Sequence, residues 1–212
     1  MKLIYFDVYG RAEAMRMLLT HAKVEFEDFR LSYADWPAYK KSDDSPLEFD
    51  QVPVLILDSG KVLSQSRAIL RYLGMEYGYM PKDAHEAYLV DSILDAFGDM
   101  TQGLIASKWE TNPERKKQII SDWLINVYPR FLAAFEKRLE SQGDSKFLVG
   151  NSLTIADFAF TSMIYSMMCN ELSEAYGFLN GPFIAHPKLN AYAANMKELF
   201  NDYLESRPKR PM

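Results

Sequence analysis

The sequence predicts two domains, an α/β domain over residues 1–79 and an all-α helical domain over residues 80–212. Strand-like and helix-like segments alternate up to about residue 80, but no strand pattern follows the Gly78–Lys82 stretch. From Ala84 onward, apolar residues recur almost throughout at helical spacing. A chain of 212 residues is long enough for each of two small domains to bury a core.

The α/β domain begins with three predicted elements. Residues 2–6 form a short apolar run, which is typical of a buried strand. Residues 11–23 place apolar side chains at helical spacing, with Glu13 and Arg16 on another side of the helix. Residues 24–27 alternate between apolar and acidic side chains, as a half-buried strand does.

The rest of this domain predicts a hairpin and a helix. Residues 54–57 form another apolar strand, residues 58–61 supply turn residues, and Val62-Leu63 begins the returning strand. Residues 64–66 can cap a helix that runs from Arg67 to about Gly78. The order strand, helix, strand, optional helix, strand, strand, helix predicts a small mixed sheet with helices packed against it.

The helical domain has three predicted breaks and one well-specified helix start. The breaks lie at Asn112-Pro113, Gly143-Asp144 and Gly181-Pro182. Thr154-Ile155-Ala156-Asp157 is a capping box, in which a hydroxyl and a carboxylate three residues apart satisfy backbone N–H groups. We assign this box a structural role only.

Composition and charge limit the kinds of partner. A net charge of −5 argues against nucleic acid or an anionic membrane. No apolar stretch approaches the ~20 residues needed to cross a bilayer, and the apolar run at the start is too short for a signal peptide. Cys169 is the single cysteine, which excludes an internal disulfide, so these features together predict a cytosolic protein.

Tyr5 is the first candidate for chemistry, since it lies near the end of the first strand and shortly before a Gly10-Arg11 turn. A hydroxyl that donates to a thiolate favours the charged form of the thiol. A tyrosine in a buried strand can equally be a core residue. Arg11 lies on the first helical turn, where the helix dipole disfavours a cation, so another charge partner or simple exposure would explain it.

Two backbone features could bind a peptide-like ligand. A cis Val52–Pro53 bond would leave the N–H and C=O of Val52 free to pair with an extended ligand, whereas a trans proline would simply begin the strand. Gln65-Ser66 lies where a strand meets a helix. The free N–H groups of that helix start suit a carboxylate, and an ordinary helix cap explains the same residues.

An acidic stripe is predicted on the first long helix of the second domain. Asp91, Asp95 and Asp99 recur every four residues, which places them near one helix face. Like charges at this spacing repel, so a cation would be stabilised nearby, although a solvated acidic face fits the same pattern.

The sequence lacks the residue patterns of several other kinds of functional site. The histidines His21, His85 and His186 have no metal-ligand spacing among themselves, so no metal site is predicted. The sequence contains no phosphate-binding loop and no nucleophile elbow. The α/β domain has no cysteine and cannot perform Cys-x-x-Cys redox chemistry, although its outline fits thioredoxin and glutaredoxin.

Five segments in a fixed order give the chain a resemblance to a known family. They are Leu3–Phe6 with Gly10–Glu13, Ala34–Trp36, Gln51–Leu55, Ser64–Leu73, and Gly150–Ser152 leading into Thr154–Asp157. With these segments the chain resembles a cytosolic glutathione transferase over essentially its full length. It is most similar to the sigma class, which includes glutathione-dependent prostaglandin D synthases and S-crystallins. The resemblance implies a thioredoxin-like N-terminal domain followed by an all-α helical domain.

The resemblance also implies a glutathione site. Tyr5 would donate to the glutathione sulfur, with Arg11 supporting the site nearby. Val52, before a cis Pro53, would pair its backbone with the cysteinyl part, and Asp99 would reach across a homodimer interface to the γ-glutamyl amino group. The remaining contacts would come from Trp36 and Lys40 at the glycyl end, Gln51 in the peptide-binding loop, and Gln65 and Ser66 at the γ-glutamyl end.

Four departures from the sigma pattern affect this site. Tyr9 replaces an arginine that many members have at the electrophile pocket, and Asp50 replaces a common glycine. Gln51 replaces a lysine, so one cationic contact is lost. Gly98 replaces an aspartate of the cluster that binds a divalent metal in some prostaglandin synthases, and we expect no metal here.

The expected function is therefore that of a homodimeric glutathione transferase that conjugates small hydrophobic electrophiles in detoxification. The electrophile pocket is expected to be lined by Val8, Tyr9, Gly103, Leu104 and Ile105. One alternative is glutathione-dependent isomerisation of a prostaglandin endoperoxide. Another is a non-catalytic binding or structural protein of the same fold, but the site residues that the chain retains favour an enzyme.

Overall fold

A four-stranded mixed sheet forms the centre of the N-terminal domain in the computed structural model, which describes residues 1–42 and 45–212. Its strands are β1 (Lys2–Phe6), β2 (Glu27–Leu31), β3 (Val54–Ile56) and β4 (Val62–Ser64). In the order β2-β1-β3-β4, β1 runs parallel to β2 and antiparallel to β3, and β4 returns antiparallel to β3. The predicted mixed sheet and hairpin are confirmed.

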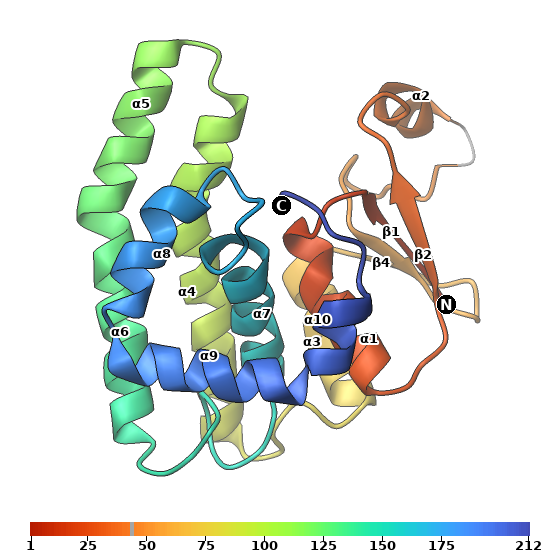
Figure 1. Cartoon of the computed structure of the whole chain (residues 1–212). Coiled ribbons are helices and arrows are strands. Elements are labelled where there is room, and N and C mark those ends of the chain that lie inside the picture. Colours follow the sequence, from red (N-terminus) through yellow and green to blue (C-terminus); the bar gives the residue numbers. More distant parts are fainter. Residues whose placement is uncertain (43–44) are drawn as a thin grey trace.

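The helices of this domain follow the predicted order. A short 3₁₀ turn, η1 (Gly10–Ala12), leads into α1 (Glu13–His21), α2 (Trp36–Lys41) follows β2, and α3 (Ser66–Glu76) follows β4. In Figure 1, α1 and α3 lie between the sheet and the helical domain, whereas α2 lies at one end of the sheet. Most of α1 is buried because it packs against α7 of the second domain.

The second domain is helical throughout, as predicted. Its elements are α4 (Ala84–Trp109), α5 (Pro113–Asp122), the π-helical turn η2 (Trp123–Val127), α6 (Tyr128–Ser141), α7 (Ile155–Met163), the π-helical turn η3 (Ile164–Met168), α8 (Tyr176–Ile184), α9 (Pro187–Leu199) and α10 (Asn201–Ser206). Asn112 caps α5, and the predicted capping box begins α7. Within the described part of the chain, no helix is long and apolar enough to cross a membrane.

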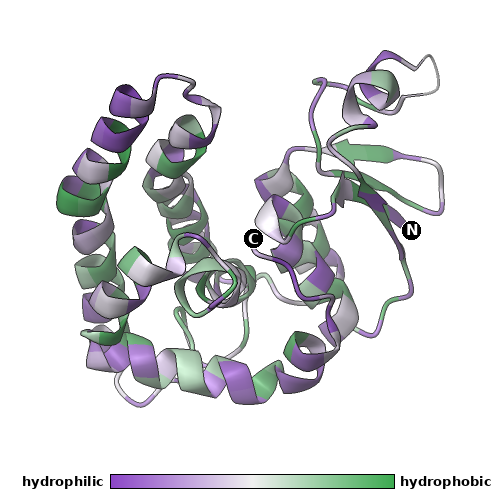
Figure 2. Cartoon of the chain, turned by 45° about the horizontal axis from the view of Figure 1, so that its top comes forward, coloured by the Kyte–Doolittle hydropathy of each residue, from purple (hydrophilic) through white to green (hydrophobic). Residues whose placement is uncertain are grey.

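One continuous core joins the two domains. Buried apolar residues of β1, α1 and α3 form a single cluster with those of α4, α6, α7 and α9. Many polar residues lie on the outer faces of the helices (Figure 2). The domains therefore share a rigid boundary, and the site described below lies next to it.

Three predicted elements differ from the structure. The strand expected at residues 24–27 lies instead at Glu27–Leu31, because pairing with β1 starts at Glu27 opposite Lys2, while Val24 N–H still bonds to a carbonyl of α1. The helix expected over residues 11–23 begins as the 3₁₀ turn η1 and ends at His21. The break expected at Gly181-Pro182 is absent, because α8 continues through it with Leu179 and Phe183 buried on its inner side.

Candidate active site

Tyr5 lies on β1 with its hydroxyl directed at the start of the first helix. The backbone N–H of Arg11 donates to the Tyr5 hydroxyl oxygen over 3.2 Å. Burial is the largest cause of a pKa for Tyr5 above its usual 10.0, so the phenol stays protonated near neutral pH. Within the described residues the Tyr5 hydroxyl only accepts, from Arg11 N–H, so its hydrogen is available for donation to a ligand.

Gly10 makes this arrangement possible. Its φ of +45° lies in the left-handed region, and a Cβ at this position would lie 2.7 Å from the Tyr5 hydroxyl oxygen. A larger residue would therefore push against the group that we expect to act on the ligand. The sequence showed Gly10 only as a turn residue, since its approach to Tyr5 depends on the path of the chain.

Arg16 on α1 binds the loop between β1 and η1. Its guanidinium is buried and donates to the carbonyl oxygens of Val8 over 2.7 Å and of Tyr9 over 3.2 Å. Asp28 on β2 accepts from its Nε over 3.0 Å. Sequence reasoning missed this role, because a buried arginine has the same helical spacing as one on an exposed polar face.

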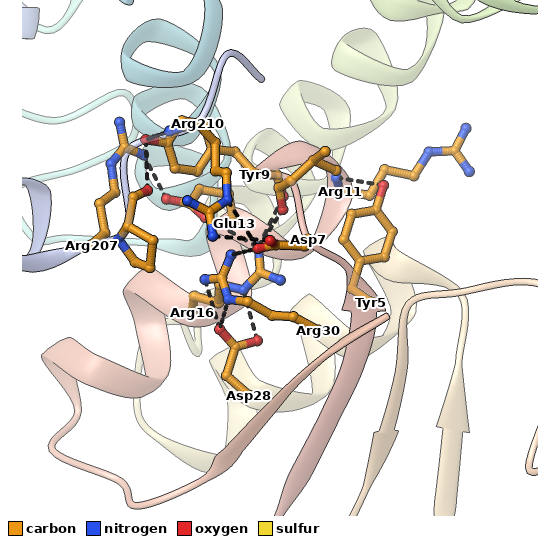
Figure 3. A network of polar contacts seen from close by, with 12 residues as sticks. Tyr5, Asp7, Tyr9, Arg11, Glu13, Arg16, Asp28, Arg30, Arg207 and Arg210 are labelled. Carbon is orange, nitrogen blue, oxygen red and sulfur yellow. Dashed lines mark hydrogen bonds and ion pairs between the residues drawn. The ribbon is translucent and has the colours of Figure 1, made fainter. Parts of the chain in front are cut away.

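Aromatic rings form a wall beside Tyr5. The Phe6 ring stacks on Tyr33 at a centroid distance of 4.5 Å and meets Trp36 edge-on at 5.4 Å. Lys108, near the end of α4, donates to the Tyr33 hydroxyl over 3.2 Å, which brings the second half of α4 close to this wall. The exposed Arg11 side chain points away from the polar network drawn in Figure 3.

Lys40 and Asp50 form an ion pair at the edge of the site. Lys40 Nζ lies 3.3 Å from Asp50 Oδ2, and both side chains are partly exposed. Asp50 has a φ of +53°, in the left-handed region that favours glycine. Trp36 and Lys40 lie near opposite ends of the short helix α2.

The Val52–Pro53 bond is cis, as expected. Val52 makes no backbone hydrogen bond within the described residues, so both of its polar groups can pair with a ligand. Gln65 precedes α3 with a φ of +71°, and its Nε2 donates to Gln51 Oε1 over 3.3 Å. Ser66 is the first residue of α3. The fold therefore places Gln51, Gln65 and Ser66 together.

The acidic stripe on α4 has cationic partners on α3. Arg71 Nε donates to Asp91 over 2.6 Å, and Arg67 Nη1 donates to Asp95 over 3.0 Å. Sequence reasoning considered only the stripe's own helix and missed these arginines. Asp99 is exposed and has no ion-pair or hydrogen-bond partner in the described part of the chain, which distinguishes it from the other two.

The residues expected to line the electrophile pocket do not all face one space. Val8, Leu104 and Ile105 are partly or fully exposed. Tyr9, however, is only 3% exposed, because the C-terminal segment covers it. A Cβ at Gly103 would lie 2.7 Å from Trp123, so this side of α4 packs inside the helical domain. Tyr9 is therefore covered and Gly103 is half-buried, and a role for both in lining an electrophile pocket stays a prediction.

Comparison with known proteins assigns both domains to one family. Residues 1–75 match the model of the glutathione S-transferase N-terminal domain, and residues 98–207 match that of the C-terminal domain. Within the described residues, no group of three or more histidine, cysteine, aspartate or glutamate side chains is placed to hold a metal ion.

Individual relatives agree with this assignment. The chain is 36% identical to glutathione S-transferase 1 of Ascaris suum, over 99% of this chain and 98% of that protein. It is 39% identical to hematopoietic prostaglandin D synthase of Gallus gallus, over 74% of each chain. The crystal structure of monomeric Na-GST-3, a glutathione S-transferase from the hookworm Necator americanus, superposes with a TM-score of 0.81 and 30% identity, covering 100% of this chain and 98% of that one. The chain therefore belongs to the glutathione S-transferase family.

Proposed function

We propose that this glutathione transferase uses Tyr5 to hold the glutathione sulfur as a thiolate for attack on an electrophile. The observation that carries the proposal is the 3.2 Å hydrogen bond from Arg11 N–H to the Tyr5 hydroxyl oxygen. This bond orients the hydroxyl, and its donation into the oxygen makes the O–H a stronger donor. A protonated phenol that donates to the sulfur favours the thiolate and lowers the pKa of the thiol.

Glutathione would lie along the edge of the N-terminal domain. Val52 would pair with the cysteinyl backbone, and Gln65 with Ser66 would hold the γ-glutamyl carboxylate at the start of α3. Trp36 and Lys40 would contact the glycyl end, where a ligand carboxylate could replace Asp50 as the partner of Lys40. A partly exposed pair of this kind contributes little to stability, so exchanging its partner costs little.

The electrophile would bind between the β1–η1 loop and the second half of α4, against Val8, Leu104 and Ile105. Tyr9 and Gly103 would support these walls from behind. The apolar side chains of Val8, Leu104 and Ile105 suit a small hydrophobic electrophile, as in detoxification.

A second candidate activity is isomerisation of a prostaglandin endoperoxide, which the 39% identity to the Gallus gallus prostaglandin D synthase favours. We give it second place because of the acidic stripe. A Cβ at Gly98 would lie 2.5 Å from Arg67 Nη1, so an arginine of this chain already occupies the space beside the missing aspartate. No divalent metal is part of either proposal.

We also propose a sigma-class homodimer in the cytosol. Asp99, which has no partner within residues 1–42 and 45–212, supports a contact with glutathione bound to a second copy. The monomeric hookworm structure shows that a related fold does not require a partner, so sedimentation is needed to decide between these states.

The decisive experiment replaces Tyr5 with phenylalanine and measures conjugation of glutathione to chlorodinitrobenzene. Tyr5→Phe should lower turnover near neutral pH by roughly 10²-fold, the usual loss for one positioned donor, while glutathione binding stays nearly intact. The pH–rate profile should move to higher pH. Tyr77→Phe is the control, since it removes a hydroxyl without a hydrogen-bond partner in the described part of the same domain. Equal activity of Tyr5→Phe and wild type would show that Tyr5 is only a core residue.

A further inference from the structure

The C-terminal segment, residues 207–212, crosses back over the loop that follows β1. We call this segment the strap. Figure 1 shows that the chain end lies between the helical domain and the start of α1. The N–H of Tyr9 donates to the carbonyl of Met212 over 2.8 Å. The Tyr9 hydroxyl donates to the carbonyl of Pro208 over 3.1 Å and accepts from the N–H of Arg210 over 3.1 Å.

Charged groups reinforce these backbone contacts (Figure 3). Arg210 donates from Nε and Nη2 to the two carboxylate oxygens of Asp7, over 3.1 and 2.9 Å. This forked contact is the first cause of a pKa for Asp7 below its usual value. Arg207 lies 3.9 Å from the centre of the Tyr9 ring and bonds to the fully buried Glu13 carboxylate.

The strap and Arg16 both bind the loop that follows β1. Arg16 binds the carbonyl oxygens of Val8 and Tyr9, while the strap binds the Asp7 side chain and both the N–H and the hydroxyl of Tyr9. The next two residues are Gly10 and Arg11, which lie against the Tyr5 hydroxyl. A displacement of the loop would therefore change the contact that orients Tyr5.

We propose that the strap keeps the Arg11 N–H on the Tyr5 hydroxyl, with Arg210 and Tyr9 as positioning residues. This inference rests on the proposed function of Tyr5. The effect passes through the backbone, because the charged and titratable groups that face Tyr5 are Arg11 in η1, Arg16 in α1 and Tyr33 after β2, and not Arg210. Loss of the Arg11 donation would weaken the O–H of Tyr5 as a donor and raise the pKa of the bound thiol.

The test compares Arg210→Ala with Lys209→Ala, which removes the same charge from an exposed neighbour in the strap. Conjugation rates are measured across pH, and the thiolate of bound glutathione is titrated by its ultraviolet absorbance. Arg210→Ala should lower kcat/KM at mildly acidic pH by about fivefold, the factor that corresponds to one net hydrogen bond. Its thiolate titration should move to higher pH, and its KM for glutathione should change little. Lys209→Ala should match wild type.

Tyr9→Phe provides a second, milder variant. It keeps the ring under Arg207 but removes the hydroxyl that binds Pro208 and Arg210. Tyr9→Phe should move the titration in the same direction, and it carries the test if Arg210→Ala does not fold. A lower melting temperature with an unchanged thiolate titration in the folded variant would overturn the inference and leave the strap a purely structural element. Tyr5→Phe is measured alongside, because an unchanged titration in that variant would reject the proposed function itself.

Discussion

Asp157 offers a direct test of what holds the start of α7 in the helical domain. Its carboxylate is fully buried and accepts four hydrogen bonds. Two come from backbone N–H groups, those of Leu148 and Thr154, each over 2.9 Å. Two come from hydroxyls, those of Thr154 over 3.0 Å and Tyr192 over 3.1 Å. Asp157→Ala would remove all four acceptor contacts from the start of α7, the helix that packs on α1.

The expected loss in the free energy of unfolding follows from the two backbone N–H groups. The hydroxyls can rotate toward other acceptors, but the N–H groups of Leu148 and Thr154 would stay buried without a partner. Each such group costs about 1–3 kcal/mol, so the free energy of unfolding should fall by roughly 2–6 kcal/mol. For a chain of this size, 1 kcal/mol corresponds to about 2–4 °C, which predicts a melting temperature lower by roughly 5–20 °C.

Asp83→Ala is the matched control. Asp83 caps α4 and also accepts from two backbone N–H groups, those of His85 and Glu86, but at an exposed position where water can replace it. Its loss should cost only about 1 kcal/mol. Calorimetric unfolding of both variants would measure the difference. Equal destabilisation of the two would refute the argument that burial makes the Asp157 contacts costly to lose.

The same carboxyl gives a pH dependence with a defined sign. Burial raises the pKa of Asp157 from 3.8 to about 6, against the lowering effect of its donors. The folded state therefore binds this proton more tightly than the unfolded state, and the resulting stabilisation is complete below pH 3.8 and is lost as pH rises through about 6. The stability of wild type relative to Asp157→Ala should fall over this interval, and a difference that rises instead would contradict the sign.

Three further predictions concern the site. Gly10→Ala should reduce turnover by about 10²-fold, because the added Cβ would meet the Tyr5 hydroxyl. Gly60→Ala is the control: Gly60 has a φ of +81° and no atom near an added Cβ, so this variant should be less stable but should turn over normally. Asp99→Asn should weaken glutathione binding by about 1.5–3 kcal/mol in calorimetry if the site is completed across a dimer, and a sedimenting monomer with normal affinity would argue against that. Asp7→Asn should destabilise the protein at neutral pH, because the pKa of Asp7 is lowered, chiefly by Arg210, and its carboxylate contributes stability above pH 3.8. That contribution should be lost as pH falls below 3.8 and through the lowered pKa of the folded state, and a constant difference across pH would contradict this.

Local patterns in the sequence determined the elements whose signals lie within a few residues. The hairpin at residues 54–64, the long helix α4 and the capping box of α7 all depend on turn residues, helical spacing or a cap three residues away. The five family segments also predicted a glutathione site, and the cis Val52–Pro53 bond that they implied is present in the structure. The prediction of a strand at residues 24–27 was wrong. Those residues do alternate in polarity, but pairing with β1 decides where β2 begins.

Tertiary structure decided which polar residues are buried and what they touch. Arg16 has the helical spacing of a surface residue, yet its guanidinium is buried against Asp28 of β2 and the carbonyl oxygens of the loop that follows β1. Tyr9 was expected at an open pocket, but its hydroxyl bonds to Pro208 and Arg210, about 200 positions further along the chain. No local pattern encodes such a contact, because its existence depends on where the whole helical domain returns the chain. The sequence thus determined the family and indicated the residues that we propose around the glutathione sulfur, whereas the fold alone decided what holds those residues in place.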